Sequence, residues 1–413
     1  MEKFVIDMKY KVFLVAALLA VVSCEKDPGD NNNPYKGLDL TTKSVEFVEE
    51  GNAFSFDFIN RVNASTEKDY IISPLSMQFL LGMILDGAQG DTADEICQVL
   101  GYGKGEVEAV NEYCLSMLQQ LPKLDKKTTL NIANAIFVDD GWPLLDSYKA
   151  DVSRYYDAAV SNLDFADGKG SLKAINGWCA DHTNGMIPKI LNEVSTEMLA
   201  YLLNAMYFKS QWLEKFPKAN TSDEPFKTAS GAKRTVKMMK MEKSLGYAET
   251  DVYKAVRLPY GNGAFSMTAF LPLEGYSLSD VTAMLGKQAG SDFRPHFDCE
   301  VDLWLPRFET KFHINLNDLL SEMGMPRSFD ERADFKGMSQ YALYLSFVQQ
   351  DAVIKVDEDG AEAAVVSSAG MMKETSVGPG DHVVFHANEP FLYVISETSS
   401  GAVLFAGRYG GVE

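Results

Sequence analysis

The side chains with the strongest nucleophilic, acid–base or metal-binding character are scattered along this 413-residue chain. No two cysteines form a C-x-x-C pair and none has a histidine at ligand spacing, so the sequence predicts neither a zinc site nor a disulfide framework. It also lacks a G-x-S-x-G, H-E-x-x-H or Walker motif, and no strand is followed by G-x-G-x-x-G. We therefore expect no enzymatic activity, no bound metal and no cofactor. We expect free or buried thiols at Cys97, Cys114, Cys179 and Cys299, and surface or hydrogen-bonded imidazoles at His182, His296, His313, His382 and His386.

The most unusual stretch of the chain runs from Glu358 to Thr375. Between Ala361 and Met372 it has one charged residue and no proline, so nothing prevents it from forming a β-strand. Exposed connections are usually rich in proline, asparagine, aspartate and glycine, whereas this one consists of alanine, valine, serine and methionine. We interpret it as a loop that is able to become a strand. One face of that strand would hold only small or apolar side chains, with Glu362 on the other: Ala361, Ala363, Val365, Ser367, Ala369 and Met371.

The residues just before this stretch must position it. Ala352 to Val356 is a strongly β-prone run. Gly360 follows, and glycine allows the backbone either to fold back or to straighten. The sequence therefore predicts a strand that ends in a hinge.

The hinge residues Glu358, Gly360, Glu362, Ala363 and Ala364 resemble the reactive-loop hinge of the serpin family. From this stretch alone, the alternative is an alanine-rich surface loop. Other segments also match the family in order, so that the resemblance extends from Val45 to Tyr409: Ser73-Pro74-Leu75-Ser76, the turn from Gly87 to Thr92, Ile175-Asn176-Gly177-Trp178, Asn204 to Trp212, Leu305 to Phe308 and Leu404 to Arg408.

The resemblance implies an α+β fold with a large mixed or antiparallel main sheet, two smaller sheets, about nine helices and an exposed reactive-centre loop at about 358–381. It also implies that the main sheet can open to admit a further strand. The residues at the base and at the top of that opening would be Ser73, Pro74, Ser76, Asn204, Trp212, Arg307 and Gln350. Arg307 and Glu358 match an ion pair where the loop enters the sheet. Gln350 stands where the family has a histidine, so an amide replaces the usual bridge to Asn204.

Local patterns predict several elements that carry these residues. An amphipathic helix starts near Val45, and Ser76 is expected to cap a buried helix over Met77 to Leu85. Leu130 to Phe137 is expected to be a strand and Tyr148 to Tyr156 a helix. A central strand is expected to run from Asn204 into an aromatic cluster.

The function implied by the resemblance is suicide-substrate inhibition of serine or cysteine endopeptidases. A protease would attack the loop, form a covalent acyl complex and be trapped as the cleaved loop inserts into the main sheet. In the family the cut lies fourteen residues beyond the hinge glycine, which places it between Glu374 and Thr375, with cuts after Lys373 or Met372 as alternatives. The alternative function is that of a non-inhibitory serpin, a surface binding or chaperone-like protein.

The N-terminal region resembles a bacterial lipoprotein precursor. Val12 to Val22 is an apolar run too short to span a bilayer, and it ends in a lipobox-like motif at Cys24. We expect a signal peptide over 1–23, the lipidated Cys24 and a flexible tether over 24–43, and the serpin domain over 44–413. This predicts a cell-envelope lipoprotein of the outer membrane, facing either the periplasm or the cell surface.

Composition limits the partners. The chain is 46% hydrophobic, which suits a large globular core, and carries a net charge of −20, which would repel nucleic acid. We therefore expect no nucleic-acid partner. The family resemblance implies a monomer whose partner is a target protease, and the lipid on Cys24 would be its only attachment to a membrane.

Overall fold

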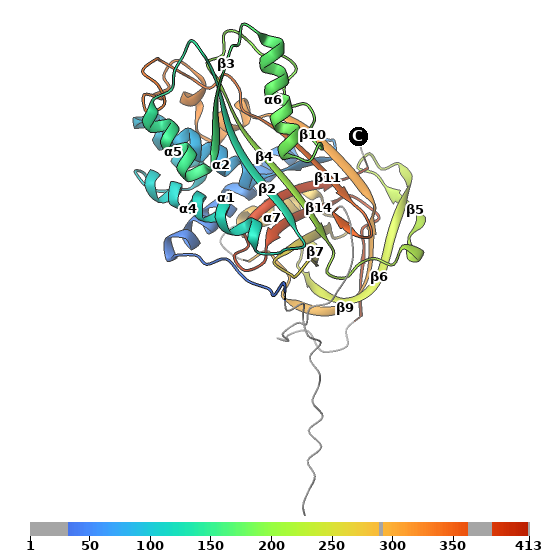
Figure 1. The fold of residues 1–413 in the computed structure, drawn as a ribbon. Coiled ribbons are helices and arrows are strands. Elements are labelled where there is room, and N and C mark those ends of the chain that lie inside the picture. The colour runs from blue at the N-terminus through green and yellow to red at the C-terminus, as the bar shows by residue number, and fades with distance from the viewer. Residues whose placement is uncertain (1–31, 289–291, 362–381, 412–413) are drawn as a thin grey trace, which may run out of the picture.

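The computed structural model describes residues 32–288, 292–361 and 382–411. Several predicted sites lie outside these ranges: the signal peptide, Cys24, Glu362, Ala363, Ala364, Met372, Lys373, Glu374 and Thr375. Within them, α-helices cover both faces of long strands (Figure 1). The helices are α1 (Thr42–Ser65), α2 (Pro74–Asp86), α3 (Gly90–Leu100), α4 (Val107–Gln120), α5 (Asp146–Tyr156), α6 (Gly168–His182), α7 (Leu278–Lys287) and α8 (Asn317–Met323).

The strands form three sheets in the described chain. The largest has the order β1-β15-β14-β8-β7-β6-β9-β13, with β5 paired to β6. Its members are β1 (Tyr70–Ile72), β5 (Ser222–Lys227), β6 (Lys233–Glu249), β7 (Tyr253–Tyr260), β8 (Phe265–Pro272), β9 (Phe297–Pro306), β13 (His382–His386), β14 (Phe391–Glu397) and β15 (Val403–Tyr409).

The main sheet expected from the sequence is divided into two parts. One part has the order β12-β4-β2-β3 and the other pairs β10 with β11. Within the described chain no ladder joins β4 to β11, and β12 pairs with one end of β4. We refer to the interval between the facing edges of β4 and β11 as the lane. These strands are β2 (Thr129–Asp139), β3 (Ala158–Leu163), β4 (Ala200–Gln211), β10 (Phe308–Asn315), β11 (Gln349–Val356) and β12 (Gly360–Ala361).

Strand β4 presents two different faces. Its odd-numbered side chains from Tyr201 to Tyr207 are buried, and several of them pack with Ile175 of α6. The even-numbered residues from Ala200 to Phe208 are only partly buried, although most are apolar. The face that points toward α2 is therefore incompletely covered.

The N-terminal end of α2 differs from the sequence prediction. The capping residue is Ser73, not Ser76: its hydroxyl accepts a hydrogen bond from the Ser76 N–H at 3.2 Å. Pro74 occupies the first helical position, where a missing N–H costs nothing. The helix therefore begins three residues earlier than expected.

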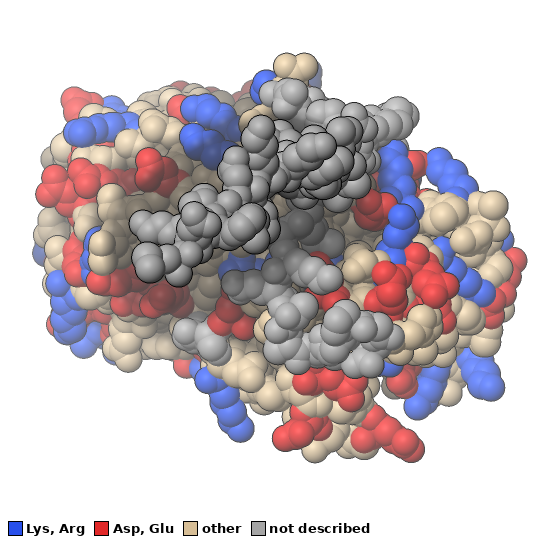
Figure 2. All heavy atoms as spheres, turned by 90° about the horizontal axis from the view of Figure 1, so that it is seen from below, with Lys and Arg blue, Asp and Glu red and all other residues tan. Residues whose placement is uncertain are grey.

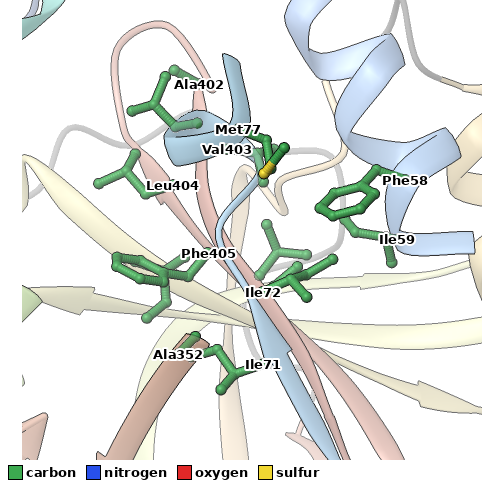
Figure 3. Close-up of a cluster of buried hydrophobic side chains, with 14 of the residues drawn as sticks. Phe58, Ile59, Ile71, Ile72, Met77, Ala352, Ala402, Val403, Leu404 and Phe405 are labelled. Atoms are coloured by element: carbon green, nitrogen blue, oxygen red, sulfur yellow. The ribbon is translucent and has the colours of Figure 1, made fainter. Parts of the chain in front are cut away.

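The core beneath the divided sheet joins segments distant in sequence. Figure 3 shows Ile71 of β1, Phe405 of β15 and Ala352 of β11 lying together, all of them buried. Phe58 of α1 and Met77 of α2 extend the same cluster. Burial of this surface attaches β11 to the largest sheet rather than to β4.

The predicted elements around Leu130–Phe137, Tyr148–Tyr156 and Asn204 are present as β2, α5 and β4. Eight α-helices are found in the described ranges, against about nine expected. None of the helices in these ranges has the length and apolarity needed to cross a bilayer.

Part of the segment predicted to be a tether lies against the body. Asn33 is buried, donating to Asp125 Oδ1 at 2.6 Å and accepting from the Lys126 N–H at 2.9 Å. The Asn262 side chain donates to the Pro34 carbonyl at 3.3 Å. The chain is therefore anchored from Asn33 onward.

Candidate functional site

The site is the turn that leads from β11 into β12. Asp357 and Gly360 form an antiparallel bridge, so the chain reverses there. Gly360 then pairs with Gln211 and Ala361 with Ser210, antiparallel to β4. The beginning of the loop thus lies in the lane between β11 and β4.

Gly360 is required at this position for two reasons. Its φ of +137° is disfavoured for any residue with a side chain. A Cβ atom there would also lie 2.4 Å from the Ser210 carbonyl oxygen and 2.7 Å from the Trp212 nitrogen. Both constraints come from its close approach to β4.

Three consecutive carbonyl groups hold the turn to the segment after β4. The indole N–H of Trp212 donates to Asp357 O at 2.9 Å, and its backbone N–H donates to Asp359 O at 3.1 Å. The Phe216 N–H donates to Glu358 O at 3.1 Å. Trp212 is itself fixed by stacking on Tyr260, with ring centroids 4.4 Å apart.

The Glu358 side chain forms the predicted ion pair with Arg307. It also accepts a hydrogen bond from the Thr221 hydroxyl at 2.7 Å. The carboxylate is 3% exposed while the Arg307 side chain is 46% exposed. Burial by itself would raise the pKa of Glu358, but Arg307 and Thr221 outweigh it and lower that pKa below its ordinary value.

Two further ion pairs at the turn, both formed by Asp359, could not be predicted from the sequence. Asp359 contacts the ammonium groups of Lys218 at 2.6 Å and Lys215 at 3.2 Å. The hydrogen bond from Lys218 lowers the pKa of Asp359 below its ordinary value, and Lys215 adds to that effect. Burial acts in the opposite direction but is outweighed. The available signal was the run of three acidic residues, 357–359, directly before the hinge glycine.

Other residues that were predicted to lie where the main sheet opens come together at the N-terminal end of α2. The Ser73 N–H donates to Gln350 Oε1 at 2.8 Å, and Gln350 Nε2 donates to the Ser73 carbonyl at 2.9 Å. The Ser73 hydroxyl donates to Leu404 O at 2.7 Å. Gln350 therefore ties β11 to the cap of α2.

Asn204 does not bond to Gln350, so the amide does not replace the expected bridge. The Ser76 hydroxyl donates to Asn204 Oδ1, and Asn204 Nδ2 donates to Asn134 Oδ1 at 2.7 Å. The oxygen and the nitrogen of the Gln350 side-chain amide both bond to the backbone of Ser73 instead. The two halves of the sheet are thus each tied to α2 rather than to one another.

The remaining candidates for chemistry are in unreactive settings. The four described cysteines are free and buried, as expected, and burial raises the pKa of Cys97 to about 11 and that of Cys114 to about 12. Four of the five histidines contact carboxylates, for example His386 with Asp302 at 2.9 Å. The fifth, His182, bonds to the Trp178 carbonyl at 2.7 Å.

Comparison with known proteins relates this arrangement to one family. The family model described as Serpin (serine protease inhibitor) matches residues 49–410. Serpin B6 of Bos taurus is 33% identical over 374 residues, covering 87% of this chain and 98% of that protein.

Two solved structures have the same fold. The thermophilic serpin tengpin in its native state has a TM-score of 0.78 and 27% identity, covering 92% of this chain and 97% of that one. The native stressed conformation of Arabidopsis AtSerpin1 has a TM-score of 0.79 and 26% identity, covering 89% and 98%. The α+β fold predicted from the sequence is confirmed.

Proposed function

The chain belongs to the serpin family, and on that premise we propose that it is a suicide-substrate inhibitor of serine or cysteine endopeptidases. The observation that carries the proposal is β12, because its two residues already pair with β4 in the open lane. Extending that ladder toward the other end of β4 would insert the loop as a full strand.

The register of β12 predicts each partner of the inserted strand. Continuing from Ala361 opposite Ser210 would place Ala363 opposite Phe208 and Ser367 opposite Asn204. Directly opposite residues share a face, so the small side chains would cover the half-buried face of β4. The same register ends with Met371 opposite Ala200, at the beginning of β4.

The chemistry is supplied by the protease. Its serine hydroxyl or cysteine thiol attacks the carbonyl carbon of the residue before the cut, and a protease base takes the proton. The peptide bond breaks, the new amine of the next residue takes that proton, and an ester or thioester remains. Insertion of fourteen residues at about 3.3 Å each carries the acylated protease roughly 45 Å.

Trapping follows because deacylation needs an intact oxyanion hole. Loss of one donor there costs about 3 kcal/mol. A protease pulled against the far end of the sheet loses that alignment before water can cleave the acyl bond.

The test is a protease panel scored for SDS-resistant complexes, with mass spectrometry of the released C-terminal peptide. A peptide starting at Thr375 supports a cut after Glu374. Peptides starting at Glu374 or Lys373 support cuts after Lys373 or Met372. Cleavage before Ala369 without any stable complex would show a substrate, and would favour a non-inhibitory surface protein.

The proposed location is the outer membrane, through a lipid on Cys24. Cys24 lies nine residues before Asn33, so an extended chain would keep Asn33 within about 30 Å of the bilayer. Asn33 bonds to Asp125, and the neighbouring Gly261 N–H donates to Gln211 O at 2.8 Å, at the end of β4 that carries β12. The end of the molecule at which β12 pairs with β4 would therefore face the membrane. Figure 2 shows acidic and basic side chains interspersed on this end.

Fractionation tests the anchor. Cys24→Ala should move the protein from the membrane to the soluble fraction, whereas the matched change at a buried thiol, Cys299→Ala, should not. Retention of the Cys24→Ala protein in the membrane would contradict lipidation. Protease shaving of whole cells distinguishes the cell surface from the periplasm.

A further inference from the structure

Three large aromatic side chains are exposed near the end of β4 that lies away from β12. Trp142 is 44% exposed, Tyr341 36% and Tyr344 56%. The rings of Trp142 and Tyr341 form an edge-to-face pair with centroids 4.9 Å apart. We refer to these three residues as the aromatic platform.

The platform lies beside the first residue of β4. Ala200 pairs with Val138, and the Asp139 N–H donates to Leu199 O at 2.9 Å. The Trp142 N–H donates to Asp139 O at 3.0 Å, so Trp142 follows directly from this contact.

Tyr344 reaches the same place from the segment before β11. It lines a cavity of about 80 Å³ together with Leu199 and Ala200. Two segments about two hundred residues apart in sequence therefore present aromatic side chains at one end of the open lane.

This is where the proposed reaction would deliver the protease. In the register of β12, Met371 would lie opposite Ala200, and Glu374 would follow about 10 Å further on. The acyl bond would then be held next to the aromatic platform.

We infer that Trp142, Tyr341 and Tyr344 form the contact surface for the displaced protease and stabilise the trapped complex. Exposed tyrosine and tryptophan provide large, amphipathic contact area and are enriched among residues that dominate binding energy. The partner that fits is the surface around the active site of the acylated protease, which insertion presses against this end. The inference rests on the proposed inhibitory function and deepens it.

The test compares wild type with a triple variant, Trp142→Ala, Tyr341→Ala and Tyr344→Ala, using a protease that wild type traps. Release of active protease from the isolated complex should become at least about fivefold faster, while the association rate constant stays within about twofold, because first contact occurs at the opposite end. The matched control is Tyr276→Ala, which removes an aromatic side chain 46% exposed elsewhere. Equal release rates for wild type and the triple variant would overturn the inference.

A spectroscopic readout separates direct contact from a general loss of stability. The inhibitor is labelled with 5-fluorotryptophan, and the Trp142 resonance is assigned by Trp142→Phe. On complex formation that resonance should shift and lose solvent sensitivity, whereas cleavage of the loop by a protease that forms no complex should leave it solvent-exposed. An unchanged Trp142 resonance in the complex overturns the inference alone, while failure of wild type to form any complex overturns the proposed function and the inference with it.

Discussion

Replacement of Glu358 by glutamine should accelerate spontaneous insertion of the loop. The native turn holds this carboxylate almost fully buried against Arg307 and Thr221. Glutamine has nearly the same shape and keeps one oxygen, but it removes the charge that faces the guanidinium. Because the turn must open before more of the loop can enter, this contact is lost before the barrier to insertion.

The magnitude follows from the environment of each partner. A hydrogen bond to a charged group contributes about 1.5–3 kcal/mol when buried. The Arg307 side chain is 46% exposed, so screening reduces that value toward the range of surface pairs. We expect a loss of about 1–2 kcal/mol from the native state, which corresponds to a conversion rate roughly 5 to 30 times faster.

The assay follows native monomer on native gels during incubation below the unfolding transition, with residual protease trapping measured in parallel. Glu309→Gln is the matched control, since Glu309 forms an exposed pair with Lys311 at 3.0 Å on the adjacent β10. The control should convert within about threefold of wild type. If Glu358→Gln converts no faster than Glu309→Gln, the pair does not restrain the loop.

Three further predictions concern the same opening. The pKa values of Glu358 and Asp359 are lowered in the native state from ordinary values of 4.5 and 3.8. The stability that these two carboxylates contribute is therefore present at neutral pH and is lost as the pH falls through the lowered values. Spontaneous insertion of the loop, followed on native gels over a pH series, should accelerate below about pH 4.5, and less steeply in Glu358→Gln. Gln350→Ala should leave the N–H and C=O of Ser73 buried without their amide partner and reduce the free energy of unfolding in urea by about 1–3 kcal/mol, and a loss below 0.5 kcal/mol would contradict the assigned bonds. Ala363→Pro should turn the proposed inhibitor into a substrate, because proline removes a ladder donor, while Glu362→Gln on the opposite strand face should preserve trapping. Wild-type stoichiometry of complex formation for Ala363→Pro would refute insertion.

Much of the architecture could be predicted from local sequence. The β-prone run before Gly360, the small residues after it and the strand around Asn204 are periodic patterns of neighbouring residues, and the structure has β11, the reversal and β4 where those patterns lie. The pairing of Arg307 with Glu358 was accessible through the family resemblance alone. Even the cap of α2 had a local signal, because Pro74 marks the first helical position and points to Ser73.

The remaining features depended on contacts between distant segments. The sequence contains Asp359, Lys215 and Lys218, but only the fold brings the two lysines to the turn. Gln350 could have bonded to Asn204, yet the fold places the backbone of Ser73 within hydrogen-bond distance of both the oxygen and the nitrogen of its side-chain amide.

The same holds at the two ends of the molecule. Asn33 is anchored by Asp125, and Trp142 lies against Tyr341, although each pair is separated by about a hundred residues or more. Patterns of period two or 3.6 specify which face of an element is buried. They do not specify which side chain of another element will meet it, because that depends on the relative position of packed elements in three dimensions.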